Sequence, residues 1–84
     1  MATTTIINFI IMRTELNVIT VNINGAARQL HDSTHIAALI EEMGLSGKRI
    51  ALERNGEIVP RSSYATQQLA DGDKLEVVVA VGGG

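Results

Sequence analysis

The residues of this sequence best suited to chemistry are its last three, Gly82, Gly83 and Gly84. They follow Glu76–Val81, a stretch with the β-branched composition of a strand. Glycine has no side chain and accepts φ angles of either sign, so such a tail can thread a narrow active-site channel. A partner enzyme could then activate the α-carboxylate of Gly84, for example as an acyl-adenylate, for attack by a nucleophile. We therefore predict that Gly84 reacts and that Gly82 and Gly83 form a threading arm.

No other residues have the spacing of a catalytic or metal site. His31 and His35 are four positions apart, as metal ligands on helices can be, but no carboxylate–histidine cluster accompanies them. Asp71-Gly72-Asp73 offers too few oxygens for a calcium loop and is typical of a turn. No Gly-rich loop between a strand and a helix could hold a phosphate. The sequence predicts no catalytic residues, no metal ligands and no bound cofactor, and hence a protein substrate or carrier rather than an enzyme.

Composition argues against several further classes. The formal net charge is −2 and the Lys and Arg residues are scattered, whereas nucleic-acid-binding proteins usually carry a basic face. There is no cysteine, and therefore no disulfide or thiolate chemistry. The apolar block Ile6–Met12 is far shorter than the about 20 residues that span a bilayer, and it lacks the flanks of a secretory signal. We expect a cytoplasmic protein that binds neither nucleic acid nor membrane.

A hairpin and a helix are the first elements expected to position the tail. Val18–Ile23 alternates as a strand does, and Asn24-Gly25 favours a tight type I′ turn into a second strand that ends near Leu30. Asp32-Ser33-Thr34 offers N-cap oxygens for a helix, and Gly44 suits its left-handed C-cap. The apolar side of this helix is expected to consist of Ile36, Leu39, Ile40 and Met43.

The second half of the sequence predicts three more strands. Arg49–Arg54 alternates, Asn55-Gly56 makes another tight turn, and Glu57–Val59 is a short strand that ends at Pro60. A connection with one helical turn at Ala65–Leu69 then leads to the last strand. Tyr64 is expected to cover the core, and Arg49, Arg54 and Arg61 are expected to be solvated or to form a contact patch.

The last strand, Lys74–Val81, is apolar on both faces, Val78 and Ala80 included, which is typical of a buried central strand. The expected order is two strands, a helix and three strands, and the last strand is central. This order predicts an α+β fold of the β-grasp (ubiquitin-like) type, with one main helix covering a mixed sheet. We expect the β-grasp domain at residues 18–81 and a flexible Gly tail at 82–84. Residues 1–17 form an N-terminal extension that is an added edge strand, a pairing segment between two copies or a disordered leader.

Several stretches of the sequence together resemble the ThiS family of sulfur carriers in bacterial thiazole (thiamin) biosynthesis. They are residues 50–61 (IALERNGEIVPR), Tyr64, residues 69–78 (LADGDKLEVV) and the glycine end. The hairpin turn and the helix match the front of the family, so that the resemblance covers about residues 18–84. The first 17 residues exceed what the family needs.

The resemblance implies a mechanism and partners. In this family an E1-like adenylyltransferase (ThiF) uses ATP to adenylate the C-terminal glycine. A cysteine desulfurase supplies sulfur for a thiocarboxylate, and thiazole synthase (ThiG) takes up that sulfur. Carried over, the resemblance makes Gly84 the adenylated and thiocarboxylated residue. From strand alternation we add Val78, Ala80 and Ala51 as the candidate partner surface; the alternative is that residues 1–17 cover them.

Three other functions stay open on the sequence. MoaD-like carriers of molybdopterin synthesis share the fold and the Gly-Gly end, but they usually have a proline-containing segment before the glycines, and none occurs after Val77. A ubiquitin-like modifier would be joined through Gly84 to a lysine amine, which the tail permits equally. A plain β-grasp interaction domain would carry the glycine end without using it, as a frayed terminus.

Overall fold

The computed structural model describes residues 17–80. The predicted Gly tail, and the predicted N-terminal extension up to residue 16, lie outside the described residues, so these two assignments stay predictions. The described part contains five strands, one α-helix and one short 3-10 helix, in an order that agrees with the predicted one.

The chain begins with the predicted hairpin, formed by β1 (Val18–Ile23) and β2 (Ala26–His31) in antiparallel register. Its turn has positive φ angles at both central residues, 52° at Asn24 and 89° at Gly25. A type I′ turn requires this geometry, and Asn-Gly adopts it at the lowest steric cost. The alternate residues of β1 and Leu30 of β2 are buried, as the alternation predicts.

Helix α2 (Ile36–Glu42) packs its predicted apolar side into the core, with Ile36 and Leu39 fully buried. The predicted side-chain cap at residues 32–34 is wrong: the N-cap is His35, and it makes no side-chain capping hydrogen bond. The first helical amides instead donate to backbone carbonyls of a distant loop, Ile36 N to Gln67 O (3.0 Å) and Ala37 N to Tyr64 O (2.8 Å). These bonds satisfy amides that a cap would otherwise bind. Gly44 has φ +73°, as predicted for the C-cap.

Strands β3 (Ile50–Arg54) and β4 (Glu57–Ile58) form the second hairpin, with φ 52° at Asn55 in the tight turn. The helical turn after it is the 3-10 helix η1 (Arg61–Ser63). It lies before the predicted position because Pro60, whose fixed φ of −67° suits the start of a helical turn, begins it directly.

The last strand, β5 (Lys74–Val79), lies in the middle of the sheet, as predicted. The strand order is β2-β1-β5-β3-β4, with β5 parallel to β1 and antiparallel to β3. Its two faces differ, however. Leu75 and Val77 are buried, whereas the side chain of Val78 is 62% exposed. The expectation of a strand buried on both faces is wrong because the described residues place a helix on one face of the sheet only.

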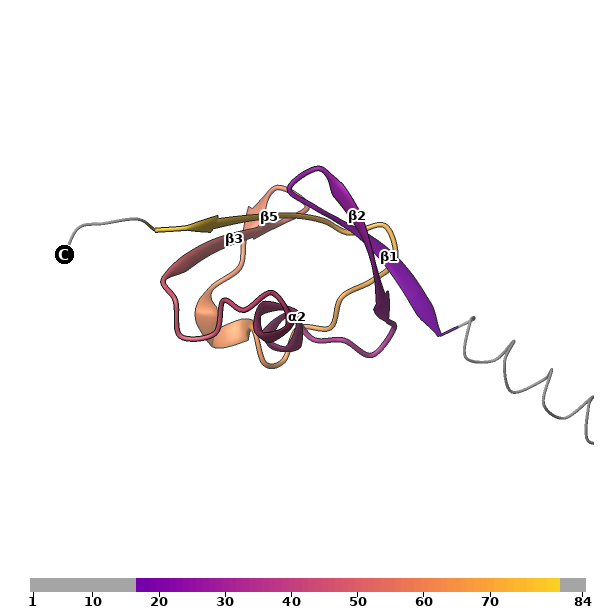
Figure 1. Ribbon diagram of the computed structural model, residues 1–84, viewed down its shortest axis with the longest axis horizontal. Coiled ribbons are helices and arrows are strands. Elements are labelled where there is room, and N and C mark those ends of the chain that lie inside the picture. The colour runs from indigo at the N-terminus through magenta and orange to yellow at the C-terminus, as the bar shows by residue number, and fades with distance from the viewer. Residues whose placement is uncertain (1–16, 81–84) are drawn as a thin grey trace, which may run out of the picture.

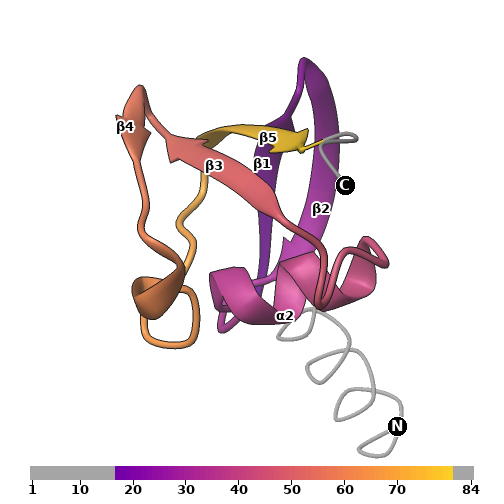
Figure 2. The same cartoon turned by 90° about the vertical axis from the view of Figure 1, so that its left-hand side faces the viewer.

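Figures 1 and 2 show the two layers, the twisted sheet on one side and α2 with the connecting loops on the other. The core between them contains aliphatic residues of β1, β2, β3, β5 and the helix, and Tyr64 is buried with them, as predicted. This is the predicted α+β, β-grasp arrangement. Because β5 is hydrogen-bonded within a packed sheet, it provides a rigid base for the residues that follow it.

Candidate functional site

The outer face of β5 and β3 carries the residues predicted as a partner surface. Ala51 of β3 is the register partner of Val78, and the next residue of that face, Ala80, donates from its amide to Arg49 O at 2.9 Å. Ala51, Val78 and Ala80 are all exposed among the described residues. The structure therefore brings the three together at the end of the sheet where β5 finishes.

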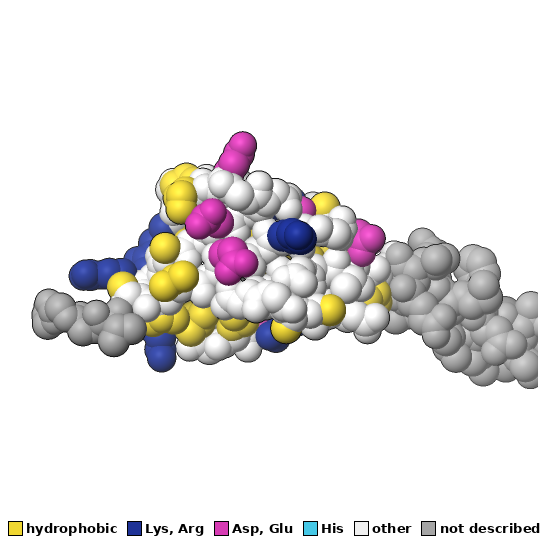
Figure 3. Space-filling view, turned by 90° about the horizontal axis from the view of Figure 1, so that it is seen from above, with side chains coloured by type: hydrophobic (Ala, Val, Ile, Leu, Met, Phe, Trp, Pro, Cys, Tyr) yellow, Lys and Arg dark blue, Asp and Glu magenta, His cyan; other side chains and the backbone are white. Residues whose placement is uncertain are grey.

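Two further features of this face were missed by sequence reasoning. Ile58 of β4 is 67% exposed and is the register partner of Glu53, which puts it on the same face. Glu53 in turn lies opposite Glu76 of β5, although like charges at directly opposed positions are unfavourable. Figure 3 looks onto this face and shows hydrophobic and acidic side chains next to each other. The place of Ile58 on this face follows from its register with Glu53, which the alternation of a very short strand does not specify. We name this surface the outer patch: Ala51, Glu53, Ile58, Glu76, Val78 and Ala80.

The side chain of Asn24 holds β5 shortly before the strand ends. Its Nδ2 donates to Val77 O (3.0 Å) and its Oδ1 accepts from Val77 N (2.8 Å), so the amide takes the place of one residue of a neighbouring strand. The backbone amide of Asn24 also donates to Leu75 O at 2.9 Å. The first hairpin therefore fixes β5 from one side while β3 fixes it from the other.

The start of β5 is fixed by Asp73, which is 6% exposed. Its carboxylate accepts hydrogen bonds from Arg54 Nε (2.9 Å), Asn55 Nδ2 (3.0 Å) and the Ala70 amide (2.9 Å), and Arg54 Nη2 lies 2.8 Å away. Burial by itself would raise the pKa of Asp73. The hydrogen bonds from Ala70, Asn55 and Arg54 and the positive charge of Arg54 outweigh it and lower the pKa below its ordinary value.

These contacts bear on the roles expected of two arginines and on the turn predicted before β5. The sequence predicts a solvated or contact position for Arg54, but its side chain is only 22% exposed and is paired with Asp73. Arg61 also makes a structural contact, from Nη2 to Lys48 O at 2.8 Å. The predicted turn at Asp71-Gly72-Asp73 exists, with φ +86° at Gly72. The role of Asp73 was not found because its partners come from a separate hairpin.

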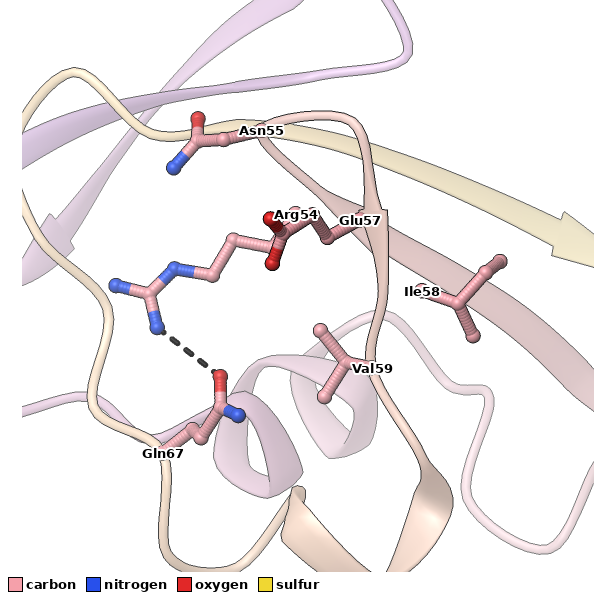
Figure 4. Close-up of a pocket in the computed structure, with 6 residues that line it drawn as sticks. All are labelled: Arg54, Asn55, Glu57, Ile58, Val59 and Gln67. Atoms are coloured by element: carbon pink, nitrogen blue, oxygen red, sulfur yellow. Dashed lines mark hydrogen bonds between the residues drawn. The ribbon is translucent and has the colours of Figure 1, made fainter.

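Arg54 also borders a shallow hollow of about 360 Å³ next to β4. Figure 4 shows the guanidinium pointing toward Gln67, whose Oε1 accepts from Nη1 at 3.1 Å, while Ile58 and Val59 point to opposite sides of their strand. Since Asp73 already neutralises this guanidinium, the hollow does not have the character of an anion site.

The histidines also have local roles. His31 Nδ1 lies 2.8 Å from Ser33 Oγ, and His35 occupies the N-cap of α2. Residues 17–80 contain no group of three or more His, Cys, Asp or Glu side chains placed to hold a metal ion. Among the same residues, no helix has the length and apolar character needed to cross a membrane. The reactive residues predicted from the sequence, Gly82, Gly83 and Gly84, lie outside the described part.

A mixed five-stranded sheet with one covering helix and a central last strand defines the class of ubiquitin-like β-grasp proteins. The model of the ThiS family matches residues 21–84, about three quarters of the sequence, and the chain belongs to this family.

Individual relatives agree with this assignment. A thiazole synthase of Paramagnetospirillum magneticum is 50% identical over 62 residues, 74% of this chain, and the sulfur carrier protein ThiS of Bacillus subtilis is 38% identical over 53 residues, 63% of this chain and 80% of the relative. The chain spans only 19% of the length of that thiazole synthase. The crystal structure of ThiS from Geobacter metallireducens has the same fold, with a TM-score of 0.67 and 23% identity over 79% of this chain and all of the other.

Proposed function

We propose that this protein is a sulfur carrier for thiazole formation in thiamin biosynthesis, and that Gly84 carries the sulfur. The observation that carries the proposal is the extent of the family match, which runs through the whole glycine end to residue 84. The proposal requires Gly84 to be the last residue of the mature protein, because its α-carboxylate is the group that reacts.

The proposed chemistry has three steps at the carboxyl group of Gly84. A carboxylate oxygen of Gly84 attacks the α-phosphorus of ATP, and pyrophosphate leaves, which gives an acyl-adenylate. The persulfide sulfur carried by the desulfurase then attacks the carbonyl carbon, a C–S bond forms and AMP leaves, which gives an acyl disulfide. A second thiol attacks the sulfur on the desulfurase side of the S–S bond, is itself oxidised to a disulfide, and releases the thiocarboxylate. ATP and the catalytic groups belong to an E1-like partner of the ThiF type, and a cysteine desulfurase supplies the sulfur. The carrier itself binds no cofactor and catalyses none of these steps.

The described part of the protein supports this role by fixing the start of the arm. Asn24 binds Val77 on one side of β5, β3 pairs with β5 on the other side, and Asp73 holds the beginning of the strand. An arm that leaves a rigid strand reaches a partner active site with less loss of conformational entropy than one that leaves a loose segment. The outer patch provides a partly apolar surface next to the exit of the arm, which an E1-like enzyme and a thiazole synthase would contact in turn.

The sulfur acceptor in this proposal is a ThiG-like thiazole synthase. This choice of acceptor is supported by the similarity of the chain to a segment of a thiazole synthase, which is 50% identical over 62 residues. The similarity indicates that carrier and synthase sequences occur within one protein in Paramagnetospirillum magneticum. Two domains found in one chain in one organism often work together as separate chains in another.

Adenylation tests the proposal. The purified protein is incubated with a ThiF-like enzyme, ATP and labelled pyrophosphate, and the exchange of label into ATP is measured. We expect exchange with the full chain and none with a variant that lacks Gly84. Equal exchange by both variants, or none with either while the enzyme accepts its own carrier, contradicts the proposed role of Gly84.

A further inference from the structure

Strand β5 is paired on both sides only as far as Val77. Toward β1, the register partners are Asn22 with Lys74 and Ile23 with Leu75, and the side chain of Asn24 then binds both backbone groups of Val77. Toward β3, pairing continues to the end of β5, and the Ala80 amide donates to Arg49 O at 2.9 Å. Figure 1 shows β5 continuing past the tip of the first hairpin beside β3 alone.

The backbone of Val79 faces this open side. Successive strand residues direct their N–H and C=O groups to opposite edges. Since Val77 faces Asn24 and Ala80 faces β3, the N–H and C=O of Val79 point toward the β1 side, beyond Asn24. Within residues 17–80 no hydrogen bond joins them to a partner.

The side chain of Val79 is uncovered at the same place. Leu75, Val77 and Val79 share the inner face of β5, and their exposed fractions rise along the strand from 1% to 7% to 37%. The stretch Val78–Ala80 also has none of the charges or prolines with which natural sheets protect an open edge. Within residues 17–80, a donor and an acceptor without partners and an exposed β-branched side chain therefore lie together.

We propose that this open edge of β5 receives an extended strand of the thiazole synthase, which continues the line of β1 beyond the Asn24 turn. The inference rests on the proposed function for the identity of this partner. The added backbone accepts from Val79 N and donates to Val79 O, and its side chains cover Val79 on one face and Val78 on the other. Strand addition of this kind combines backbone hydrogen bonds with side-chain contacts. It fixes the direction in which the arm with Gly84 leaves the sheet.

The test removes the open amide without disturbing the pairs with β3. Val79→Pro eliminates the N–H that faces the open side, whereas the hydrogen bonds to β3 come from Val78 and Ala80. Val79→Thr, which keeps the N–H and the β-branched shape, is the matched control. We expect the Pro variant to melt near the wild-type temperature and to bind ThiG-like thiazole synthase about tenfold more weakly, since one hydrogen bond and its neighbouring contacts are lost. The Thr variant should bind within about twofold of wild type.

Amide hydrogen exchange of the unmodified chain keeps the test independent of how the proline variant folds. The Val79 amide should exchange rapidly in the free protein and at least about tenfold more slowly in the complex with the synthase. If the wild type binds the synthase but the exchange rate of the Val79 amide does not change, the strand addition is wrong and the proposed function is unaffected. Absence of any binding overturns the proposed partner together with this inference. Protection of Val79 that depends on the concentration of the chain alone, with dimers in sedimentation, identifies a second copy as the occupant and also overturns it.

Discussion

The guanidinium of Arg54 binds the carboxylate of Asp73 through two nitrogens, with Nε at 2.9 Å and Nη2 at 2.8 Å from the same oxygen. Arg54 is the last residue of β3 and Asp73 immediately precedes β5, so the pair joins the beginning of β5 to the end of its neighbour. Asp73 is buried, and Asn55 and Ala70 occupy its other acceptor sites.

Loss of the Asp73 charge should therefore destabilise the fold. Asp73→Asn removes the ion pair and leaves the largely buried guanidinium of Arg54 without its counter-charge, which we expect to cost about 3 kcal/mol in the free energy of unfolding. Asp71→Asn is the control: among the described residues its carboxylate accepts from the exposed Thr20 amide, and an amide oxygen can replace it. Urea denaturation of the two variants measures the difference, and equal stabilities would show that the buried pair contributes nothing particular.

The same carboxylate should make stability depend on pH in the acid range. The pKa of Asp73 is lowered in the folded state from its ordinary value of 3.8, so the unfolded chain binds the proton more tightly. The stabilisation is fully present above pH 3.8 and is lost as the pH falls through the lower folded pKa. Denaturation between pH 6 and pH 2, both values chosen to span the ordinary pKa of Asp, should show a steep acid limb. Asp73→Asn should flatten that limb, and parallel curves would contradict this assignment.

We expect both the side chain and the backbone conformation of Asn24 to stabilise the fold. Asn24→Gly keeps the positive φ of 52° accessible and deletes only the two hydrogen bonds to Val77, for an expected cost of about 2 kcal/mol. Asn24→Ala adds the strain of a left-handed conformation and should cost about 1 kcal/mol more. Thermal denaturation of the two variants measures both contributions. Equal stability of the Gly variant and wild type would show that the contacts with Val77 are dispensable.

We expect the outer patch to bind partner proteins and to contribute little to the stability of the fold. Val78→Lys places a charge on a side chain that is 62% exposed, so the unfolding free energy should change by less than about 1 kcal/mol. Binding to the E1-like enzyme or to thiazole synthase should weaken about tenfold or more. Ala38→Lys, at an exposed position of α2 in the other layer, is the control and should bind normally. Equal binding of the two variants in calorimetry would exclude the outer patch as the contact surface.

Most of the fold could be predicted from the sequence because its signals are local. Asn24-Gly25 and Asn55-Gly56 define both hairpin turns, and Gly44 defines the end of α2, since each depends on a backbone conformation that few residues adopt. The start of α2 could not be predicted in this way. Its amides bind carbonyls of Tyr64 and Gln67, which are about 30 positions further along the chain, and nearby capping residues do not reveal such a contact.

The site could be predicted only in part, for a similar reason. Strand alternation identified Val78, Ala80 and Ala51 as outward residues, and the structure places them together on an exposed face. The apolar composition of β5, however, also suggested that this face was buried. An apolar strand face that meets a partner protein has the same composition as one that meets the core, and the sequence alone does not distinguish them. Ile58 and the pair Glu53–Glu76 depend on the register between strands, which local patterns do not specify.

The glycine end should be dispensable for the fold. Deletion of Gly84 removes no packed side chain, and we expect the melting temperature to stay within about 2 °C of wild type, the range of an unimportant surface change. A clear loss of stability on this deletion would show that the end has a structural role.

The intact mass of the protein shows whether Gly84 carries sulfur. The chain is incubated with a ThiF-like enzyme, ATP, a cysteine desulfurase and cysteine, and the mass is measured before and after. We expect a gain equal to the exchange of one oxygen for sulfur, located at Gly84 by fragmentation and lost on addition of thiazole synthase with its other substrates. An unchanged mass, under conditions in which the same enzymes convert the sulfur carrier of Bacillus subtilis, would show that Gly84 carries no sulfur.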